Sequence, residues 1–308
     1  MPEPAGVPGP RAPIRAIVAG LMMIGAAHRA VGQPSPSAPR RTNETAGLQR
    51  PAIDYRVRVT PADTTGIDVT VRLRGTGDTL VLAMPAHAEY DEKTWRLVRQ
   101  IRATSPQGPA TVTRVDSSRW RVVTAGGEVT VQYRLAVPPA AQQPRGAWRN
   151  VVTSTGALFG GPYGLLYLLG AERMPVHIAL DIPADWSVAT ALDTTSDSRQ
   201  LYAASFDVVA ESPILVGRLR RWNFIAGKTP HHVVYWPLAN AAPFDTARLV
   251  ESIRRIAEQA VALFGRAPHR DYTFLIQDGA FGALEHPDCV TLGITSAGLA
   301  AGDWRGAI

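Results

Sequence analysis

Residues 129–137 read VTVQYRLAV, and an apolar side chain occupies every second position of this stretch. Such alternation is typical of a β-strand that has one face in a protein core and the other in water. The same period of two recurs at residues 55–59, 67–73 and 176–182. Short turns rich in Gly, Pro, Asp and Ser separate these stretches. The pattern predicts one all-β domain over residues 51–222, built as an antiparallel β-sandwich or saddle.

The pattern changes in residues 223–308. Residues 231–236 and 272–277 are short apolar stretches that predict strands, and the segment between them has the period of a helix. Asp245 can cap the start of that helix, and Gly265 can end it. The apolar face predicted for the helix comprises Leu249, Ile253, Ile256, Ala257, Ala260 and Phe264. We therefore expect this part of the chain to begin an α+β domain.

The amino-terminal residues have the organisation of a secretory signal peptide. Two arginines precede the apolar run of residues 16–27, and small residues lead up to a cleavage site after Gly32. The run is shorter than the roughly 20 residues that a membrane-spanning helix needs, and no other stretch is longer. We predict a signal peptide over residues 1–32 and a flexible linker over residues 33–50. The mature protein is expected to be exported, to the periplasm or the extracellular space, without membrane attachment.

Composition excludes several classes of protein. Of the 308 residues, 45% are hydrophobic and 19% are charged, which suits a folded chain and not a disordered one. The net charge of +6 is not gathered into a basic run or stripe, so no nucleic-acid partner is expected. Cys289 is the only cysteine, which excludes an internal disulfide and a cysteine-rich metal cluster.

The sequence carries no self-contained catalytic motif. The zincin pattern H-E-x-x-H, the nucleophile elbow G-x-S-x-G, the phosphate-binding loop and G-x-G-x-x-G are all absent from it. His231 and His232 are adjacent on a predicted strand, where their rings point to opposite faces and cannot share a metal ion. We therefore predict no catalytic residue and no metal ligand in this chain.

One segment has features of a peptide-binding edge strand. The predicted strand at residues 272–277 leads through a Gly-rich turn into Gly282-Ala283-Leu284-Glu285-His286. Glycines at the start of a strand let another backbone approach closely, and an acid at the far end can hold the amino terminus of a peptide. From these residues alone, an ordinary turn followed by a surface glutamate is the better explanation.

The order of several loose motifs along the chain is more specific than any one of them. They are Asp54–Thr60, Ala83-Met84-Pro85 with Tyr90, Arg119-Trp120 with Val129–Leu135, Pro183–Leu192, Phe206-Asp207 with Glu211-Ser212-Pro213-Ile214 and Gly217, Tyr272–Leu275, and Gly282–His286. This order resembles the glycyl-aminopeptidase family of zinc metallopeptidases, over most of the predicted mature chain. One departure is His87-Ala88-Glu89-Tyr90, which stands where that family usually has Pro-Gly-Ser-Tyr.

The resemblance implies a fold and a set of roles. It implies an all-β amino-terminal domain followed by a thermolysin-like catalytic domain, often with a PDZ domain, and a zinc ion held by two histidines and a glutamate. The substrate would be a peptide with a free amino terminus. Glu285 would bind its ammonium group, Gly282 and Ala283 would pair with its backbone, and Leu284 would line the groove. For His286, packing and substrate contact remain equally open.

The carboxyl end departs from the family pattern. The family's H-E-x-x-H helix follows the Gly-x-Leu-Glu-His strand by some tens of residues, whereas this sequence ends at Ile308 without it. We expect a truncated exported aminopeptidase that binds no zinc itself, is inactive alone and needs a missing carboxyl-terminal catalytic half. The alternative is a non-catalytic exported β-domain protein that binds extended peptides. An uncovered apolar face in residues 223–308 also predicts aggregation of the isolated chain.

Overall fold

The computed structural model describes residues 53–85, 93–124, 126–138, 145–160 and 163–302. The predicted signal peptide, the predicted linker and the motif at residues 87–90 lie outside these ranges. All described residues belong to one unit of the chain, residues 42–308.

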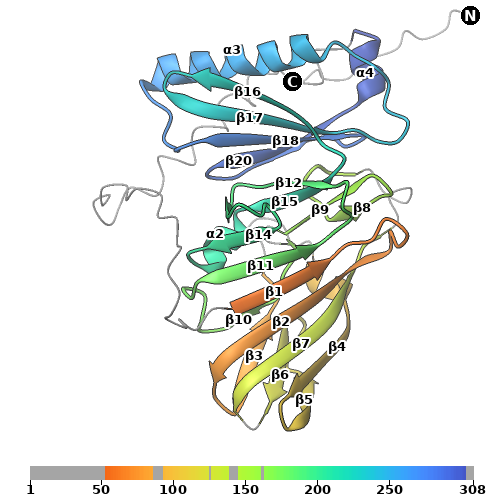
Figure 1. Ribbon diagram of the computed structural model, residues 1–308, viewed down its shortest axis with the longest axis vertical. Coiled ribbons are helices and arrows are strands. Elements are labelled where there is room, and N and C mark those ends of the chain that lie inside the picture. The colour runs from red at the N-terminus through yellow and green to blue at the C-terminus, as the bar shows by residue number, and fades with distance from the viewer. Residues whose placement is uncertain (1–52, 86–92, 125, 139–144, 161–162, 303–308) are drawn as a thin grey trace, which may run out of the picture. The chain divides into compact units, whose positions relative to one another are not determined.

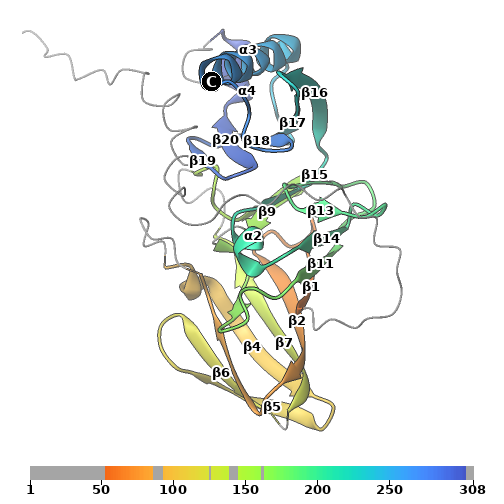
Figure 2. The same cartoon turned by 90° about the vertical axis from the view of Figure 1, so that its left-hand side faces the viewer.

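The period of two in the sequence produces the largest sheet. β7 (Gly127–Ala136) buries every second side chain from Val129 to Leu135, as its sequence predicts. It pairs with β2 (Gly66–Thr76) on one side and β4 (Val98–Ser105) on the other. The remaining elements are β1 (Ile53–Arg58), β3 (Thr79–Ala83), the 3-10 turn η1 (Thr94–Leu97), β5 (Gly108–Arg114), β6 (Arg119–Val123), β10 (Tyr167–Leu168), β11 (Val176–Asp181), β13 (Asp193–Thr194) and β14 (Gln200–Ala203). The eleven strands follow the order β10-β3-β6-β5-β4-β7-β2-β1-β11-β14-β13. Figure 1 labels all of them except β13, which is labelled in Figure 2.

The inner face of this sheet forms one large apolar core. Neighbouring strands are antiparallel except β1 and β11, which run parallel with Tyr55 beside Ile178. Two tyrosines bring hydroxyl groups into the core, and both find partners: Tyr55 Oη donates to the Leu166 carbonyl at 2.8 Å, and Tyr133 Oη accepts from the Leu166 N–H at 2.9 Å. Burial raises the pKa of both phenols, so they stay neutral hydrogen-bonding groups.

A second, smaller sheet contributes side chains to the same core. Its strands are β8 (Val151–Val152), β9 (Gly156–Gly160), β12 (Ser187–Ala189) and β15 (Pro213–Gly217), in the antiparallel order β12-β15-β9-β8. Every residue of β9 and β15 is buried. The short helix α2 (Phe206–Ala210), which the period of two does not predict, starts at Ser205, whose side chain accepts from the Val208 N–H.

Residues from Arg220 onward form a third sheet. It contains β16 (Arg220–Ala226), β17 (Thr229–Trp236), β18 (Tyr272–Asp278), β19 (Ala283–Glu285) and β20 (Cys289–Ile294), in the order β16-β17-β18-β20-β19. β17, β18 and β20 run parallel, and the two edge strands, β16 and β19, run antiparallel to their neighbours. The domain boundary expected between residues 222 and 223 falls within β16.

Two helices accompany this sheet, α3 (Thr246–Phe264) and α4 (Ser296–Ala300). α3 has the predicted caps: Asp245 accepts from the Arg248 N–H at 2.9 Å, and Gly265 is left-handed with a φ of 80°. The predicted apolar face is only partly correct. The sheet covers Leu249, Ile253 and Ala257, but Ile256 is partly exposed and Phe264, at the helix end, is 55% exposed. Figures 1 and 2 show α3 lying along one face of the sheet.

The five-stranded sheet is buried on both faces, so all seven residues of β18 are buried. One face joins α3 in a core that includes Val233, Tyr235, Phe274, Ile276 and Val290. The other face packs against the four-stranded sheet through a core that includes Leu158, Leu215, Trp236, Leu275 and Cys289. Gly156 permits this contact, because a Cβ there would lie 2.6 Å from Trp236 Nε1.

The prediction of a mainly β fold with a large antiparallel amino-terminal domain is confirmed. Within the described ranges, no helix combines the length and the apolar composition needed to cross a bilayer.

Candidate functional site

Three of the five predicted site residues form β19, the last strand at one border of the five-stranded sheet (Figure 2). A turn through Gly279, Ala280 and Phe281 leads from β18 to Gly282. Gly279 and Gly282 have φ angles of 66° and 73°, which glycine adopts without strain. These two glycines let the chain reverse and run antiparallel to β20.

The hydrogen bonds of β19 show which backbone groups face outward. Gly293 N–H donates to the Gly282 carbonyl, and His286 N–H donates to the Cys289 carbonyl, both at 2.8 Å. In an antiparallel pair, residues that bond to the neighbouring strand alternate with residues that do not. The N–H and C=O groups of Ala283 and Glu285 therefore point away from β20. Among the described residues, none pairs with these outward groups.

A segment of the amino-terminal part, residues 145–148, meets the start of this edge, and we call it the strap. Phe281 N–H donates to the Arg145 carbonyl, and the Phe281 carbonyl accepts from the Ala147 N–H, both at 3.0 Å. The ring of Trp148 meets the ring of Phe281 edge-on, with centroids 5.8 Å apart. It also lies against Gly282, where a Cβ would be 2.9 Å from Trp148 Cζ3. The strap thus covers the sheet border at Phe281 and Gly282 and leaves the outer edge of β19 free from Ala283 onward.

Glu285 lies at the free part of the edge and is half-buried. Its register partner is Val290, and Ala283 packs against the same core, so both side chains lie on the α3 face of the sheet. The pKa of the Tyr272 phenol is raised by burial and further by the Cys289 thiol and the Glu285 carboxylate. Tyr272 belongs to the same core as Val290 and so lies on the same face of the sheet as Glu285. Among the described residues, no cation or hydrogen-bond donor is paired with this carboxylate.

Leu284 and His286 lie on the opposite face of β19. Leu284 is half-buried, and His286 is buried with 7% of its surface exposed. His286 Nδ1 lies 3.2 Å from Oε2 of Glu211, the residue directly after α2. Nε2 of the same ring is buried and has no partner among the described residues. The structure thus places the His286 ring against the amino-terminal domain and away from the side of Glu285.

The described residues do not fit a zinc site. Zinc in peptidases takes three protein ligands and a water molecule, whereas no group of three or more His, Cys, Asp or Glu side chains gathers in the described ranges. His231 and His269 are neighbours, with ring centroids 6.0 Å apart, but no third such side chain joins them among the described residues. His232 points to the other face, as its position on the strand predicts, and its Nδ1 lies 2.8 Å from Asn223 Oδ1.

His231 and His269 form a neutral pair under an aromatic cover. Burial lowers the pKa of His269 to about 4, and repulsion from a protonated His231 acts in the same direction. Burial also lowers the pKa of His231, whose Nδ1 lies 2.9 Å from the Thr229 carbonyl. Phe224 stacks on the His231 ring, and Tyr272 lies beside the ring of His269. The pair is part of the α3-side core rather than a ligand set.

Sequence analysis missed the residues that hold the strap. Arg145 donates to the Asp278 carbonyl at 2.6 Å and lies 5.1 Å above the Trp236 ring. Burial lowers the pKa of Arg145 to about 10, with the Asp278 carboxylate opposing. Gln277, which is fully buried, donates to the Ala147 carbonyl. Polar residues at the end of an apolar strand were the available signal, but they do not indicate which distant segment they bind.

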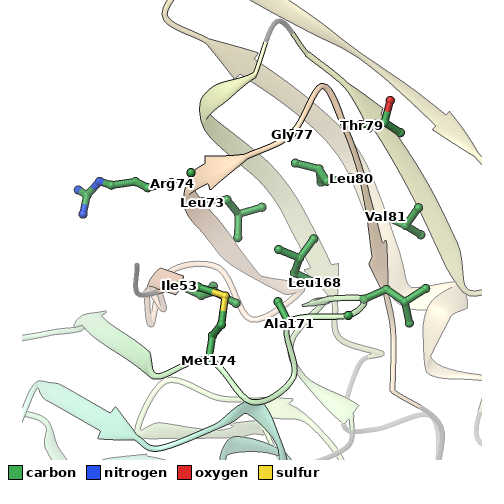
Figure 3. Close-up of a pocket in the computed structure, with 13 residues that line it drawn as sticks. Ile53, Leu73, Arg74, Gly77, Thr79, Leu80, Val81, Leu168, Ala171 and Met174 are labelled. Carbon is green, nitrogen blue, oxygen red and sulfur yellow. The ribbon is translucent and has the colours of Figure 1, made fainter. Parts of the chain in front are cut away.

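A separate hollow lies at the large sheet, between β2, β3 and the loop after β10. It has a volume of about 480 Å³ and is lined mainly by apolar side chains, among them Leu73, Leu80 and Leu168. These three side chains point into it, whereas Arg74 points away (Figure 3). Arg74 pairs with Asp54 at 3.3 Å. The hollow therefore brings no reactive group to its surface.

Comparison with known families identifies the amino-terminal domain. The family model described as the Peptidase M61 N-terminal domain matches residues 54–218. The chain belongs to the M61 peptidase family. The family resemblance predicted from the motif order is thereby confirmed. The five predicted site residues follow the matched range, and their role in this M61 chain stays a prediction.

A solved structure shares the fold of the M61 chain. An aminopeptidase N family protein from Idiomarina loihiensis superposes with a TM-score of 0.72 at 22% identity, over 80% of this chain and 43% of that one. An M1 zinc metallopeptidase from Deinococcus radiodurans gives a TM-score of 0.47 at 14% identity, over 79% of this chain and 59% of that one. The M61 chain therefore spans less than half the length of the Idiomarina protein. No curated protein matches it.

Proposed function

We propose that this M61 chain forms the amino-terminal β domain and the substrate-binding edge of an exported zinc aminopeptidase. One observation carries the proposal: β19 is an open sheet border with outward backbone groups at Ala283 and Glu285 and a carboxylate that has no cation partner among the described residues. Membership of the M61 family supports peptides as the substrate class.

The chemistry of this edge suits the free end of a peptide. An extended peptide can add to an open border as a further strand, with main-chain hydrogen bonds giving affinity. The ammonium group at its amino terminus is then attracted to the Glu285 carboxylate. The half-buried position of Glu285 strengthens this attraction, because charges interact more strongly where less water screens them. Leu284 lies on the other face of β19 and would not contact the ammonium group.

Hydrolysis needs groups that the described residues do not supply. In zinc peptidases the metal lowers the pKa of bound water to about 7 and polarises the carbonyl group. Because no described cluster fits zinc, we assign no step of hydrolysis to these residues. The proposal is that the chain alone binds peptides without cleaving them, and that cleavage requires a carboxyl-terminal catalytic half.

Export is part of the proposal. It is supported by the basic start, the apolar run of residues 16–27 and the small residues that lead up to a cleavage site after Gly32. Detection of a mature protein that begins at Gln33 in the periplasm or culture medium tests it, and retention of the full chain in the cytoplasm contradicts it.

Replacement of Glu285 tests the proposed site. The unmodified protein should bind trialanine amide at least about 10-fold more tightly than its N-acetylated form, because a charge-assisted pair is lost on acetylation. Glu285→Gln should remove this preference and leave binding of the acetylated peptide unchanged. Isothermal titration calorimetry at low ionic strength measures both affinities.

Glu128→Gln is the matched control, because Glu128 is an exposed glutamate on β7. It should retain the full preference for the unblocked peptide. Equal binding of blocked and unblocked peptides by the unmodified protein contradicts the site and favours the non-catalytic alternative. Release of alanine by the chain alone, or stoichiometric zinc in the purified protein, contradicts the proposed inactivity.

A further inference from the structure

The strap occupies part of the border on which a peptide would dock. Gly146 and Phe281 form a one-residue parallel bridge, through the two backbone hydrogen bonds of Phe281. The strap turns directly after this bridge, and the ring of Trp148 lies against Gly282, where a Cβ would be 2.9 Å from Trp148 Cζ3. The strap therefore fills the outer border at residues 281 and 282, and the border is open from Ala283 onward.

Several contacts fix the strap in this position. Arg145 donates to the Asp278 carbonyl at 2.6 Å, and Gln277 donates to the Ala147 carbonyl. Both Gly146 and Ala147 are buried. An incoming peptide would have to break these bonds and expose buried backbone in order to pair beyond Ala283. The strap is thus held in place by these bonds and ends the free sheet border at a defined residue.

We propose that the strap limits the part of a peptide that pairs with β19 to its first three residues. This inference rests on the proposed capture of the amino terminus by Glu285. A peptide held there and running toward the strap lies beside Glu285, Leu284 and Ala283. It can exchange hydrogen bonds with the outward groups of Glu285 and Ala283, which are two residues apart.

The fourth residue of such a peptide comes beside Gly282 and reaches the strap at Trp148. Because the border is already occupied there, the peptide leaves the plane of the sheet and gains no further backbone pairing. The substrate class is therefore short peptides with a free amino terminus, together with the flexible ends of longer chains. A peptide segment inside a folded strand is excluded, since it cannot turn away after three residues.

A length series tests the proposal with the protein as it exists. The probes are unblocked, carboxyl-amidated alanine peptides of two to six residues, titrated by calorimetry. Affinity should rise about 3-fold or more from two to three residues, because the second outward position becomes paired. From three to six residues it should change by less than about 2-fold. A steady rise up to six residues would overturn the proposal.

Two variants loosen the strap in different ways. Arg145→Met removes the bond to the Asp278 carbonyl, and Ala147→Pro removes the N–H that donates to Phe281. In either variant the six-residue peptide should gain about 3-fold or more over the three-residue peptide. Arg199→Met is the matched control. It also removes a bond from a guanidinium to a backbone carbonyl, since Arg199 donates to the Pro183 carbonyl at 3.0 Å, but this bond lies in the amino-terminal domain. It should keep the plateau at three residues.

Failure of the inference is separable from failure of the proposed function. A preference for unblocked peptides combined with an unbroken rise in affinity overturns the strap limit and leaves Glu285 in its role. Loosened variants that keep the plateau also overturn it. A plateau at three residues without any preference for unblocked peptides supports the strap limit and contradicts amine capture. Absence of binding for all peptides overturns both.

Discussion

β7 and β18 are both interior strands of their sheets, yet they are built differently. β7 alternates between buried and half-exposed side chains, whereas every side chain of β18 is buried. The difference follows from what covers them: β7 has a core on one face only, and β18 lies between the α3-side core and the core shared with the four-stranded sheet. A strand of the first kind needs one partner layer, and a strand of the second kind needs two.

The consequence for the candidate site is that its geometry depends on the amino-terminal domain. β19 lies at the border of the β18–β20 half of the five-stranded sheet. The strap holds the turn before it, and Glu211 meets His286 after it. The edge on which a peptide would dock is thus fixed at both ends by residues that precede Arg220 in the chain.

The largest expected effect comes from removing packing on the shared face of β18. Leu275 is fully buried between the two sheets, so Leu275→Ala should lower the free energy of unfolding by about 2–5 kcal/mol. Gln132→Ala, on the outer face of β7, removes an exposed hydrogen bond from Arg102 and should cost about 1 kcal/mol or less. Urea denaturation followed by tryptophan fluorescence measures both. Equal costs would break the comparison between the two strands.

A second test uses the neutral histidines of the α3-side core. An unfolded histidine has a pKa near 6.5, while burial lowers the pKa of His269 in the folded protein to about 4. Between these values the unfolded chain binds protons that the folded chain refuses, so stability falls as the pH falls. After allowance for solvent around the half-buried ring, we expect a loss of about 2 kcal/mol from pH 7 to pH 4.

His269→Phe should remove most of this acid-induced loss, as measured by thermal unfolding across the pH range. Tyr272→Phe is the control, because it keeps the ring contacts with His269 and adds no group that titrates there. A His269→Phe protein that still loses the same stability between pH 7 and pH 4 would assign the loss to carboxylates elsewhere in the fold.

The difference between β7 and β18 also determines how much of each strand's surroundings the sequence predicts. The alternation of apolar and polar residues around Val131 directly predicts a strand with one buried face, because a single core layer produces that pattern. β18 shows a continuous apolar run, which predicts a strand but not its two partner layers. The predicted face of α3 was wrong at Ile256, which lies at the edge of the stripe formed by the buried Leu249, Ile253 and Ala257, and at Phe264, which is the last residue of the helix.

For the site, sequence analysis identified the strand but not what surrounds it. Gly282 and Glu285 are recognisable because a glycine turn before an acid is a local pattern. The strap is not recognisable, since its bonds to Phe281 and Asp278 join segments that lie more than a hundred residues apart in the chain. The position of His286 depends in the same way on Glu211, which no local pattern links to it.

A smaller effect is expected at His286, where the five-stranded sheet meets the amino-terminal domain through Glu211. His286→Ala should lower the free energy of unfolding by about 1–2 kcal/mol, because it leaves Glu211 without this partner and opens a small space. His286→Asn, which can place a donor near the position of Nδ1, should restore part of the loss. Chemical denaturation and calorimetry with trialanine amide measure stability and binding in the same samples.

The binding data distinguish the two roles left open for His286. If the ring positions β19, His286→Ala weakens binding by several-fold but keeps the preference for unblocked over acetylated peptide. Loss of the preference itself would show that the ring contacts the ammonium group. The comparison with Glu285→Gln is therefore direct, since that variant should lose the preference and keep the stability.

The smallest effect on stability is expected at the carboxyl end of α3, where the last side chains of the helix are exposed. Leu263 is 76% exposed and neighbours Phe264, so Leu263→Lys should change the free energy of unfolding by less than about 0.5 kcal/mol. A cation also suits the carboxyl end of a helix. Light scattering should nevertheless show less self-association, because the substitution interrupts an apolar patch. Unchanged scattering would place the association elsewhere, and a loss above about 1 kcal/mol would show that this end of α3 is covered in solution.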